Sequence, residues 1–418
     1  MVSTSSTSEV RHFPKLTSMT ATTAIAARIH PELRALRRAI HADPEVGNDN
    51  PRTQARILEA LAGLDLEVTT GTSLSSVVAV LRGTAESTGP RSVVLLRGDM
   101  DGLPVVEATG QEFASATGTM HACGHDLHVA GLIGAVRILH ELRHQLPGDV
   151  VFMFQPGEEG PGGAGPMIAE GVLDAAGRRA DAAYALHVVS SQHPLGVWSG
   201  RPGVLMAAAD QCYITVRGRG GHGSQPHFAQ DPVPVACEIA IALQTMVTRQ
   251  FSAFDPVVVT VGKIAAGSKE NIIPDDARLD LTVRTFSDAN HEVIPERIGR
   301  LAHGIAEAHG MTADVDYLRG YPVTVNDPVE YGLLTDTVTD LFGADRYAEQ
   351  PFPEAGAEDF SLVAQQLPSA FIFVSAYPGD DWASAASNHS ARALFDDDVL
   401  ADCAALLAEV TLRRLQRA

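Results

Sequence analysis

Two short segments of the sequence bring together side chains suited to binding metal and moving protons. Cys123 and His125 are two residues apart, so both can reach one metal region, and a helix beginning just after them would favour the thiolate. Glu158 and Glu159 are adjacent and follow an apolar, strand-like run. Because consecutive side chains diverge, one carboxylate can bind metal while the other moves a proton. Metal-assisted hydrolysis needs this division of labour.

Each candidate residue also has an ordinary structural explanation when it is considered alone. Most Cys-x-His pairs bind nothing, and adjacent carboxylates after a strand can be a charged loop. His187 ends an apolar run, where a hydrogen-bonded core histidine is common, and His389 lies in a glycine- and serine-bearing loop. Asp99 and Asp101 follow a strand-like run and could bind metal, hold a histidine ligand in place or form a turn.

The segments around these residues alternate between helix-like and strand-like patterns. Helical spacing covers residues 28–42, 52–63 and 126–143, and strand-like runs cover 77–81, 93–96, 150–154 and 182–189. This alternation predicts a doubly wound α/β sheet with helices on both faces. Ligands in such folds bind outside the carboxyl ends of the strands, where the candidate residues fall.

The pattern changes near residue 207 and changes back after residue 326. In between, strands are expected at 211–217, 257–264, 278–285 and 312–317, and helices at 231–247 and 291–309. Afterwards a helix at 328–342, a strand at 370–374 and a helix at 397–416 restore the α/β pattern. We therefore expect a smaller α+β, ferredoxin-like domain inserted into the catalytic one. The expected division is a disordered tail at 1–24, a catalytic domain at 25–207 and 324–418, and an inserted domain at 208–323.

Length and composition support a soluble, two-domain protein. The 418 residues exceed the size at which one hydrophobic core stops growing, and the net charge of -20 argues against a nucleic-acid partner. The four cysteines are scattered without a C-x-x-C pair, which fits a reducing cytoplasm. No apolar run suits a signal peptide or a membrane span, and either Met1 or Met19 could be the true start.

Taken together, the motifs resemble those of the aminoacylase-like family of dinuclear metallopeptidases. The most similar branch contains hippurate hydrolases, indole-acetic-acid–amino-acid hydrolases and bacterial N-acyl-amino-acid deacylases. The resemblance covers about residues 28–415. It rests on the segments 97–104, 120–128, 155–160, 185–188, 218–227, 271–275, 356–361 and 388–390. Several such segments in order are far more specific than any one of them.

The resemblance implies a ligand set for two divalent metal ions. The residues at the family's ligand positions are Cys123, His125, Glu159, His187 and His389. Zinc or manganese would suit this set, and cobalt or nickel could also occupy it. Relatives have His-x-Asp where this chain has Asp99-Met100-Asp101. Asp99 and Asp101 are therefore expected to support the ligands rather than to bind metal.

The resemblance also implies how the amide bond would be cleaved. Glu158 is expected to be the general base, and His222 of the inserted domain to reach the site of the neighbouring subunit in a homodimer and stabilise the oxyanion. We expect Asn271 and Arg284 to hold the substrate carboxylate, although structural pairing explains a strand arginine equally well. The expected substrate is an N-acyl amino acid, cleaved to a carboxylic acid and a free amino acid.

Three alternatives stay open at this point. The first is a metallo-carboxypeptidase or dipeptidase of the same family. The second is a cysteine hydrolase with Cys123 as nucleophile and His125 as its base, although two residues in one loop are poorly placed for an aligned attack. The third is a non-catalytic binding homologue, against which the intact Glu158-Glu159 pair speaks.

Overall fold

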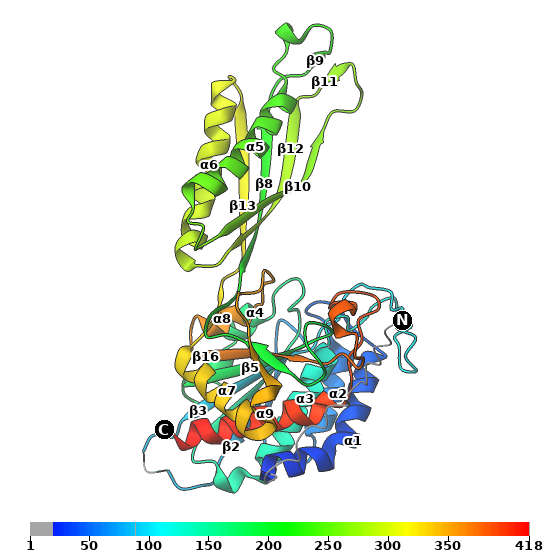
Figure 1. Ribbon diagram of the computed structural model, residues 1–418, viewed down its shortest axis with the longest axis vertical. Coiled ribbons are helices and arrows are strands. Elements are labelled where there is room, and N and C mark those ends of the chain that lie inside the picture. The colour runs from blue at the N-terminus through cyan, green and yellow to red at the C-terminus, as the bar shows by residue number, and fades with distance from the viewer. Residues whose placement is uncertain (1–19, 88, 418) are drawn as a thin grey trace, which may run out of the picture.

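Two separate sheets divide the protein into two lobes, which Figure 1 shows one above the other. The computed structural model describes residues 20–87 and 89–417. The larger lobe holds an eight-stranded sheet of order β1-β2-β4-β3-β5-β16-β6-β15. Its strands are β1 (Glu67–Thr70), β2 (Val77–Arg82), β3 (Val93–Asp99), β4 (Asp149–Gln155), β5 (Ala182–Val189), β6 (Trp198–Gly200), β15 (Tyr347–Glu349) and β16 (Ser369–Ser375). The central strands β4, β3, β5 and β16 are parallel, whereas β1 and β2 form an antiparallel edge.

Helices cover both faces of this sheet, which confirms the predicted doubly wound α/β architecture. One face packs against α1 (Ala21–His41), α2 (Pro51–Leu61), α3 (His125–Glu141), α7 (Pro328–Phe342) and α9 (Val399–Gln416). The other face packs against the short helices α4 (Ala164–Ala169) and α8 (Ser361–Ala364). Strands β3, β4 and β16 are buried along their whole length because both faces are covered. This explains their continuous apolar runs in the sequence.

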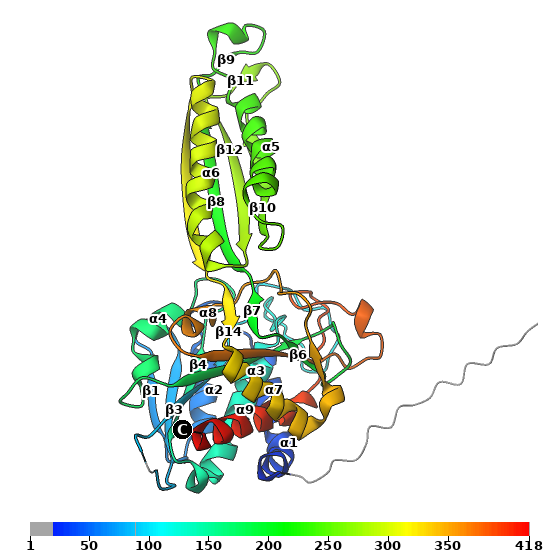
Figure 2. The ribbon, with the colours of Figure 1, turned by 60° about the vertical axis from the view of Figure 1, so that its left-hand side comes forward.

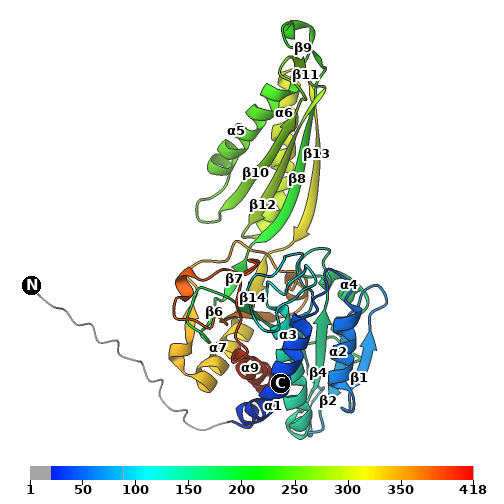
Figure 3. The same ribbon diagram turned by 90° about the vertical axis from the view of Figure 1, so that its right-hand side faces the viewer.

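The smaller lobe is an elongated four-stranded antiparallel sheet of order β10-β12-β8-β13. Its strands are β8 (Ala208–Arg217), β10 (Val257–Ala266), β12 (Asp276–Thr285) and β13 (Thr312–Tyr321). Helices α5 (Pro232–Gln250) and α6 (Asp288–Ala308) lie on one face, as Figures 2 and 3 show. Side chains of β8 alternate between buried and accessible positions, as expected for a sheet covered on one side. The order βαββαβ agrees with the expected inserted domain.

Two small antiparallel pairs complete the fold. Strands β7 (Gly203–Met206) and β14 (Thr324–Asn326) pair where the chain passes between the lobes. Strands β9 (Gly221–His222) and β11 (Ile272–Ile273) pair at the far tip of the smaller lobe. β8 begins at residue 208 and β13 ends at 321, and these ends support the domain boundaries at 207/208 and 323/324 that we propose. In the part of the chain that the structure describes, no helix is both long and apolar enough to cross a membrane.

The expectation of a disordered tail at 1–24 is wrong for residues 21–24. Residues 21–24 belong to α1, and residues 1–19 lie outside the described residues. The Thr20 side chain caps the helix by accepting the N–H of Thr23 at 3.3 Å. Thr22 is buried and donates from its hydroxyl to Glu409 of α9 at 2.9 Å. The Thr-rich segment therefore begins the helix because Thr20 caps it and Thr22 bonds to Glu409. The apolar pattern of the sequence indicates neither contact.

A buried ionic cluster joins α1 to α3. Arg37 Nε lies 2.6 Å from Asp126 Oδ2, and the two ring nitrogens of His41 lie 2.8 Å from Asp126 and 3.2 Å from Glu107. Burial disfavours a charge on His41, but Asp126 and Glu107 outweigh that effect and raise the pKa of His41 to about 9. The histidine is therefore a cation in the folded protein at neutral pH.

This raised pKa predicts a loss of stability at alkaline pH. The folded-state pKa lies above the usual 6.5, so the contribution of His41 is fully present below about pH 6.5 and is lost as the pH rises through about 9. It amounts to on the order of 3 kcal/mol. Denaturant unfolding of the wild type should show a larger fall in the free energy of unfolding between about pH 6 and 10 than His41→Gln does. Parallel pH profiles of the two proteins would contradict this assignment.

Candidate metal centre and active site

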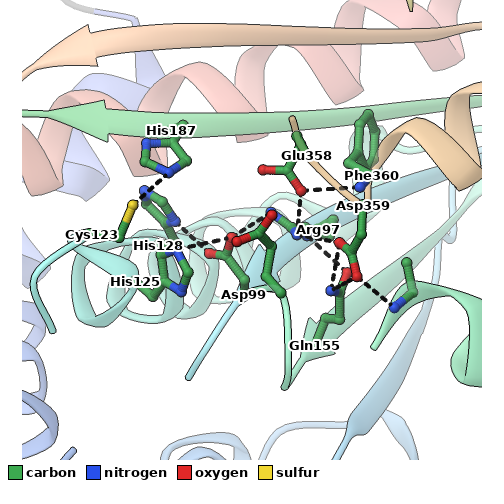
Figure 4. A network of polar contacts seen from close by, with 12 residues as sticks. Arg97, Asp99, Cys123, His125, His128, Gln155, His187, Glu358, Asp359 and Phe360 are labelled. Atoms are coloured by element: carbon green, nitrogen blue, oxygen red, sulfur yellow. Dashed lines mark hydrogen bonds and ion pairs between the residues drawn. The ribbon is translucent and has the colours of Figure 1, made fainter. Parts of the chain in front are cut away.

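The carboxyl ends of three adjacent parallel strands carry most of the candidate residues, several of which appear in Figure 4. Asp99 ends β3, Glu158 and Glu159 follow the end of β4, and His187 lies close to the end of β5. The N-terminus of α3 adds His125, its first residue. The sheet topology thus gathers segments that are far apart in the sequence, as the strand-end argument predicts.

Gly124 allows two candidate ligands to stand side by side before α3. Its φ is +82°, and a Cβ atom there would lie 2.3 Å from Cγ2 of Val188. Glycine is therefore needed both for the left-handed backbone and for the close approach to β5. With this turn in place, ligand atoms of Cys123, His125 and His187 lie within 4.8 Å of one another.

His187 presents a nitrogen lone pair to this group. Its Nδ1 lies 2.7 Å from the carbonyl oxygen of Val188, so the proton is assigned to Nδ1. Nε2 then carries the lone pair and can accept a hydrogen bond from Sγ of Cys123, which lies 3.4 Å away. Burial, followed by the neighbouring His128, holds the pKa of His187 well below its usual range. The side chain is thus a neutral imidazole, the form that binds metal.

A second group shares Cys123 with the first. Ligand atoms of Cys123, Glu159 and His389 lie within 4.8 Å of one another, and Nε2 of His389 is 3.1 Å from Oε1 of Glu159. Cys123 first and Glu159 second raise the pKa of His389 to about 10. Surroundings that favour a proton on the imidazole also favour a metal cation at the same place.

The loop that carries His389 is held in an unusual conformation. His389 has a φ of +69°, in the left-handed region that costs energy for a residue with a Cβ atom. The backbone N–H of His389 donates to the carbonyl of Ala122 at 2.9 Å, and Nδ2 of Asn388 donates to the carbonyl of Val188 at 3.0 Å. These bonds fasten the loop to the Cys123 turn and to β5, and they keep the imidazole at the cavity.

His125 provides the clearest test of whether the residues fit a metal. Its side chain is fully buried, yet neither ring nitrogen has a hydrogen-bond partner within the described chain. The nearest carboxylate oxygens, from Asp101, Asp99 and Glu159, lie at 3.4, 3.5 and 3.9 Å. Buried polar atoms are almost always paired, and a nitrogen among thiol, imidazole and carboxylate donors suits a divalent ion. The residues present therefore fit a metal centre.

Asp101 connects the backbone of the two glutamates to His125. Its carboxylate accepts the N–H of Glu158 at 3.1 Å and the N–H of Glu159 at 3.2 Å. One of the same oxygens lies 3.4 Å from Nδ1 of His125. A carboxylate behind a histidine ligand orients the ring and increases its basicity. Asp101 thus lies beside the candidate ligand His125 and binds the backbone of both glutamates.

Asp99 contacts His128, a residue to which sequence reasoning gave no role. Asp99 accepts a hydrogen bond from Nδ1 of His128, and Nε2 of His128 accepts the N–H of Val188 at 2.9 Å. Both nitrogens of His128 are therefore occupied, so this ring joins β3, α3 and β5 and has no lone pair for a metal. Its position one helical turn after His125 was the available signal.

Glu158, the expected general base, is buried beside other carboxylates. Its side chain is 7% exposed and lines the cavity. Burial, followed by repulsion from Glu358, Asp359 and Glu159, raises the pKa of Glu158 well above its usual range. A carboxylate with a raised pKa accepts protons more readily near neutral pH.

Arg97 forms ion pairs with three acidic residues, two of which lie in one group with Glu158. It lies 2.6 Å from Asp99, 2.8 Å from Glu358 and 3.0 Å from Asp359, all of them buried (Figure 4). Burial raises the pKa of Glu358 to about 8, although Arg97 opposes the shift. Sequence reasoning gave no role to Arg97, Glu358 or Asp359. The sequence indicated their importance only through their place in the motif segments 97–104 and 356–361.

A cavity of about 610 Å³ opens beside these residues, between the two lobes. Arg284 of β12 and Tyr321 of β13 line it together with the metal-centre residues. Arg284 donates to Oγ1 of Thr282 at 2.6 Å and to a backbone carbonyl, and burial lowers its pKa. Within the described residues it forms no ion pair with a carboxylate. Tyr321 donates from its hydroxyl to the carbonyl oxygen of Glu158 at 2.8 Å.

Two expected site residues do not line the cavity of their own chain. His222 lies in β9 and Asn271 directly precedes β11, both at the far tip of the smaller lobe (Figure 1). Nδ1 of His222 accepts the N–H of Ser224 at 3.1 Å, and the ring is exposed. Asn271 accepts the N–H of Gly223 through its backbone carbonyl at 2.9 Å. Within one subunit these residues are separated from Glu158 by the length of the smaller lobe.

Comparison with known proteins places this arrangement in a family. Residues 95–413 match the family model described as Peptidase family M20/M25/M40. Thermostable carboxypeptidase 2 of Saccharolobus solfataricus is 36% identical over 370 residues, which cover 87% of this chain and 91% of that protein. N-acetylcysteine deacetylase of Bacillus subtilis is 33% identical over 385 residues, covering 92% and 97%.

A solved structure agrees with these matches. The Bacillus subtilis YXEP protein, a dinuclear metal binding peptidase from the M20 family, superposes with a TM-score of 0.79 at 29% identity. The superposition covers 94% of this chain and all of that chain. The residues at the strand ends, the fold around them and these similarities agree: the chain is a hydrolase that belongs to peptidase family M20/M25/M40.

Proposed function

We propose that this hydrolase cleaves the amide bond of N-acyl amino acids and releases a carboxylic acid and a free amino acid. One observation carries the proposal: the cavity that holds the Glu158-Glu159 pair also presents Arg284, whose guanidinium has no carboxylate partner in the described chain. A half-buried, unpaired guanidinium favours a substrate carboxylate, because its fork of donors matches that group. The name of the N-acetylcysteine deacetylase relative agrees with this substrate class.

We propose that two divalent metal ions occupy the centre. The residues that would hold them are Cys123, His125, Glu159, His187 and His389. When bound, the ions would supply positive charge that polarises the amide carbonyl and activates water. Zinc and manganese suit this mixture of sulfur, nitrogen and oxygen donors, and cobalt or nickel is compatible with it.

Glu158 would take a proton from the attacking water and return it to the departing amine. Its backbone supports this role, because Asp101 accepts its N–H and Tyr321 donates to its carbonyl. Fixing the backbone on both sides of the residue holds its carboxylate close to one position. Its raised pKa favours proton uptake near neutral pH, and its burial beside the cavity brings it close to the reacting atoms.

We propose that the active form is a homodimer in which His222 and Asn271 of one subunit complete the site of the other. The support is their placement at an exposed tip, far from their own cavity, with Nε2 of His222 free of hydrogen bonds in the described chain. In that arrangement His222 would stabilise the oxyanion and Asn271 would help to hold the substrate carboxylate. The four free cysteines support a reducing, cytoplasmic location.

A carboxypeptidase is the second candidate function, favoured by the 36% identical carboxypeptidase relative. Both activities hydrolyse an amide whose amine half bears a free carboxylate, so Arg284 serves either one. The acyl half distinguishes them. We expect simple N-acetyl and N-benzoyl amino acids to be hydrolysed faster than N-blocked peptides with the same C-terminal residue. The reverse order would favour the carboxypeptidase.

The carboxylate requirement gives a direct test of the proposed substrate class. We expect the kcat/KM for an N-acetyl amino acid to exceed that for its carboxamide by about 100-fold, since only the acid forms a charge-assisted pair with Arg284. An Arg284→Gln variant should reduce this ratio mainly by slowing hydrolysis of the acid. Equal turnover of the acid and the carboxamide by the wild type would contradict the proposal.

A further inference from the structure

Besides Arg284, the cavity contains a charged residue, Glu354, to which the proposed function gives no role. Glu354 lines the same cavity as Arg284, but it belongs to none of the candidate metal-binding groups of the described chain. Its side chain is partly exposed, so the carboxylate is accessible from the cavity. In the described chain it forms no ion pair with any lysine, arginine or histidine. The cavity therefore presents an anion that the structure leaves without a counter-charge.

The backbone holds Glu354 firmly in this position. Its N–H donates to the carbonyl of Leu205 at 2.8 Å, and its carbonyl accepts the N–H of Ala207 at 3.0 Å. The residue thus forms a bridge to the β7 segment, which connects the two lobes. Residues fixed in this way on both sides present their side chains in a defined direction.

Only one of the two carboxylate oxygens has partners in the described chain. Oε1 accepts from the amide nitrogens of Gln192 at 3.4 Å and Gln350 at 3.3 Å, and both distances are long for hydrogen bonds. Gln192 itself has a left-handed backbone, with a φ of +79°, and it also lines the cavity. Two weak neutral donors orient the carboxylate without neutralising it, and Oε2 is left for a ligand.

Arg284 does not supply the missing charge. No ion pair joins Arg284 to Glu354 in the described chain, where the guanidinium donates to Thr282 and to the carbonyl of Val283. The two unpaired side chains therefore offer an anion-binding point and a cation-binding point within one cavity. A substrate that carries both a carboxylate and a separate cation matches this distribution of charge.

We propose that Glu354 is a specificity-determining residue that binds a primary ammonium group of the substrate. This inference rests on the proposed function, because it adds a cationic group to the N-acyl amino acid held by Arg284. The ammonium can come from a basic side chain in the amine half or from an aminoacyl group in place of a simple acyl group. Either source gives the same charge-assisted hydrogen bond to Oε2.

Two pairs of substrates that differ by a single amino group distinguish the two sources. Nα-acetyl-lysine and N-acetyl-norleucine differ only in the amine half, and glycyl-leucine and N-acetyl-leucine differ only in the acyl half. We expect the wild type to prefer the ammonium-bearing member of one pair by about tenfold in kcat/KM. Glu354→Gln should bring that ratio close to one and leave the neutral substrate within about twofold of wild type.

Two further variants control for indirect effects. Glu349→Gln removes an exposed carboxylate five positions away that does not line the cavity, so the preference should stay at its wild-type value. Glu354→Lys should shift the preference towards N-acetyl-glutamate, because the sign of the charge is reversed. A preference for the neutral members in the wild type, or one that Glu354→Gln does not change, would overturn the inference alone. If none of the four substrates were hydrolysed, the proposed function would fail together with it.

Discussion

A Glu158→Gln variant is expected to keep its metal ions and its affinity for substrate while kcat falls by roughly 100-fold or more. Glutamine has nearly the same shape as glutamate, and the bonds that hold this residue involve its backbone, from Asp101 and Tyr321. The substitution therefore removes the proton acceptor and leaves its surroundings in place. It also removes one of several mutually repelling carboxylates around Arg97, so the variant should be at least as stable as the wild type.

Glu159→Gln is the matched comparison, because the two residues are adjacent and the substitution is the same. Glu159 lies with Cys123 and His389 in a candidate ligand group, so its loss should weaken the hold on one metal ion. We expect lower metal content after dialysis and partial recovery of activity in excess metal. The opposite pattern, with Glu158→Gln losing a metal and Glu159→Gln keeping both, would falsify the assignment of roles. If both substitutions had only small effects, Glu158 and Glu159 would be ordinary loop carboxylates without a catalytic role.

The second large effect concerns His222 and the partner subunit. His222→Ala and Glu158→Gln should each be nearly inactive as separate homodimers. In a mixed dimer, one site combines an intact Glu158 with an intact His222 from the neighbouring chain. After full exchange of equal amounts, about one quarter of the sites would be complete, so about a quarter of wild-type activity should return.

The control for this experiment is a mixture that cannot form a complete site. Glu158→Gln mixed with Glu159→Gln places both defects in the residues that each chain supplies to its own cavity, so no activity should return. Recovery in the first mixture alone would support sharing of sites between subunits. Failure to recover activity, with exchange shown by size-exclusion or mass measurements, would contradict a role for His222 across the interface.

The sequence predicted the architecture well because the apolar periods are regular. Buried parallel strands such as β4 read as continuous apolar runs, and β8 and β12 read as alternating ones. The change between the two patterns located the inserted lobe. Short elements were missed, among them β6, β15 and α8, because three or four residues carry too little pattern to be recognised.

The candidate metal ligands could be proposed because each lies within a compact motif. The supporting network could not, because it joins distant parts of the chain. Arg97 contacts Glu358 and Asp359, which lie more than 260 residues later, and no local pattern indicates that pairing. The link from Tyr321 to Glu158 likewise crosses between the two lobes. Such contacts follow from the folded topology rather than from residue spacing.

His222 and Asn271 show a different limit of sequence reasoning. Their motif segments suggested parts in catalysis and substrate binding, but the sequence does not place the tip of the inserted lobe relative to the cavity. In the structure, these residues lie at the tip of the smaller lobe, far from Glu158 of the same chain. In the proposed homodimer they complete the site of a second copy, and the mixed-dimer experiment tests that proposal.

The most direct test of the central claim is a metal titration of the chelated protein. We expect the protein stripped of metal to lose its N-acyl amino acid hydrolysis. Addition of Zn²⁺ or Mn²⁺ should restore the activity, with saturation near two ions per chain by elemental analysis. A cysteine hydrolase relying on Cys123 would keep its activity after chelation. Full activity in protein shown to be free of metal would contradict the account.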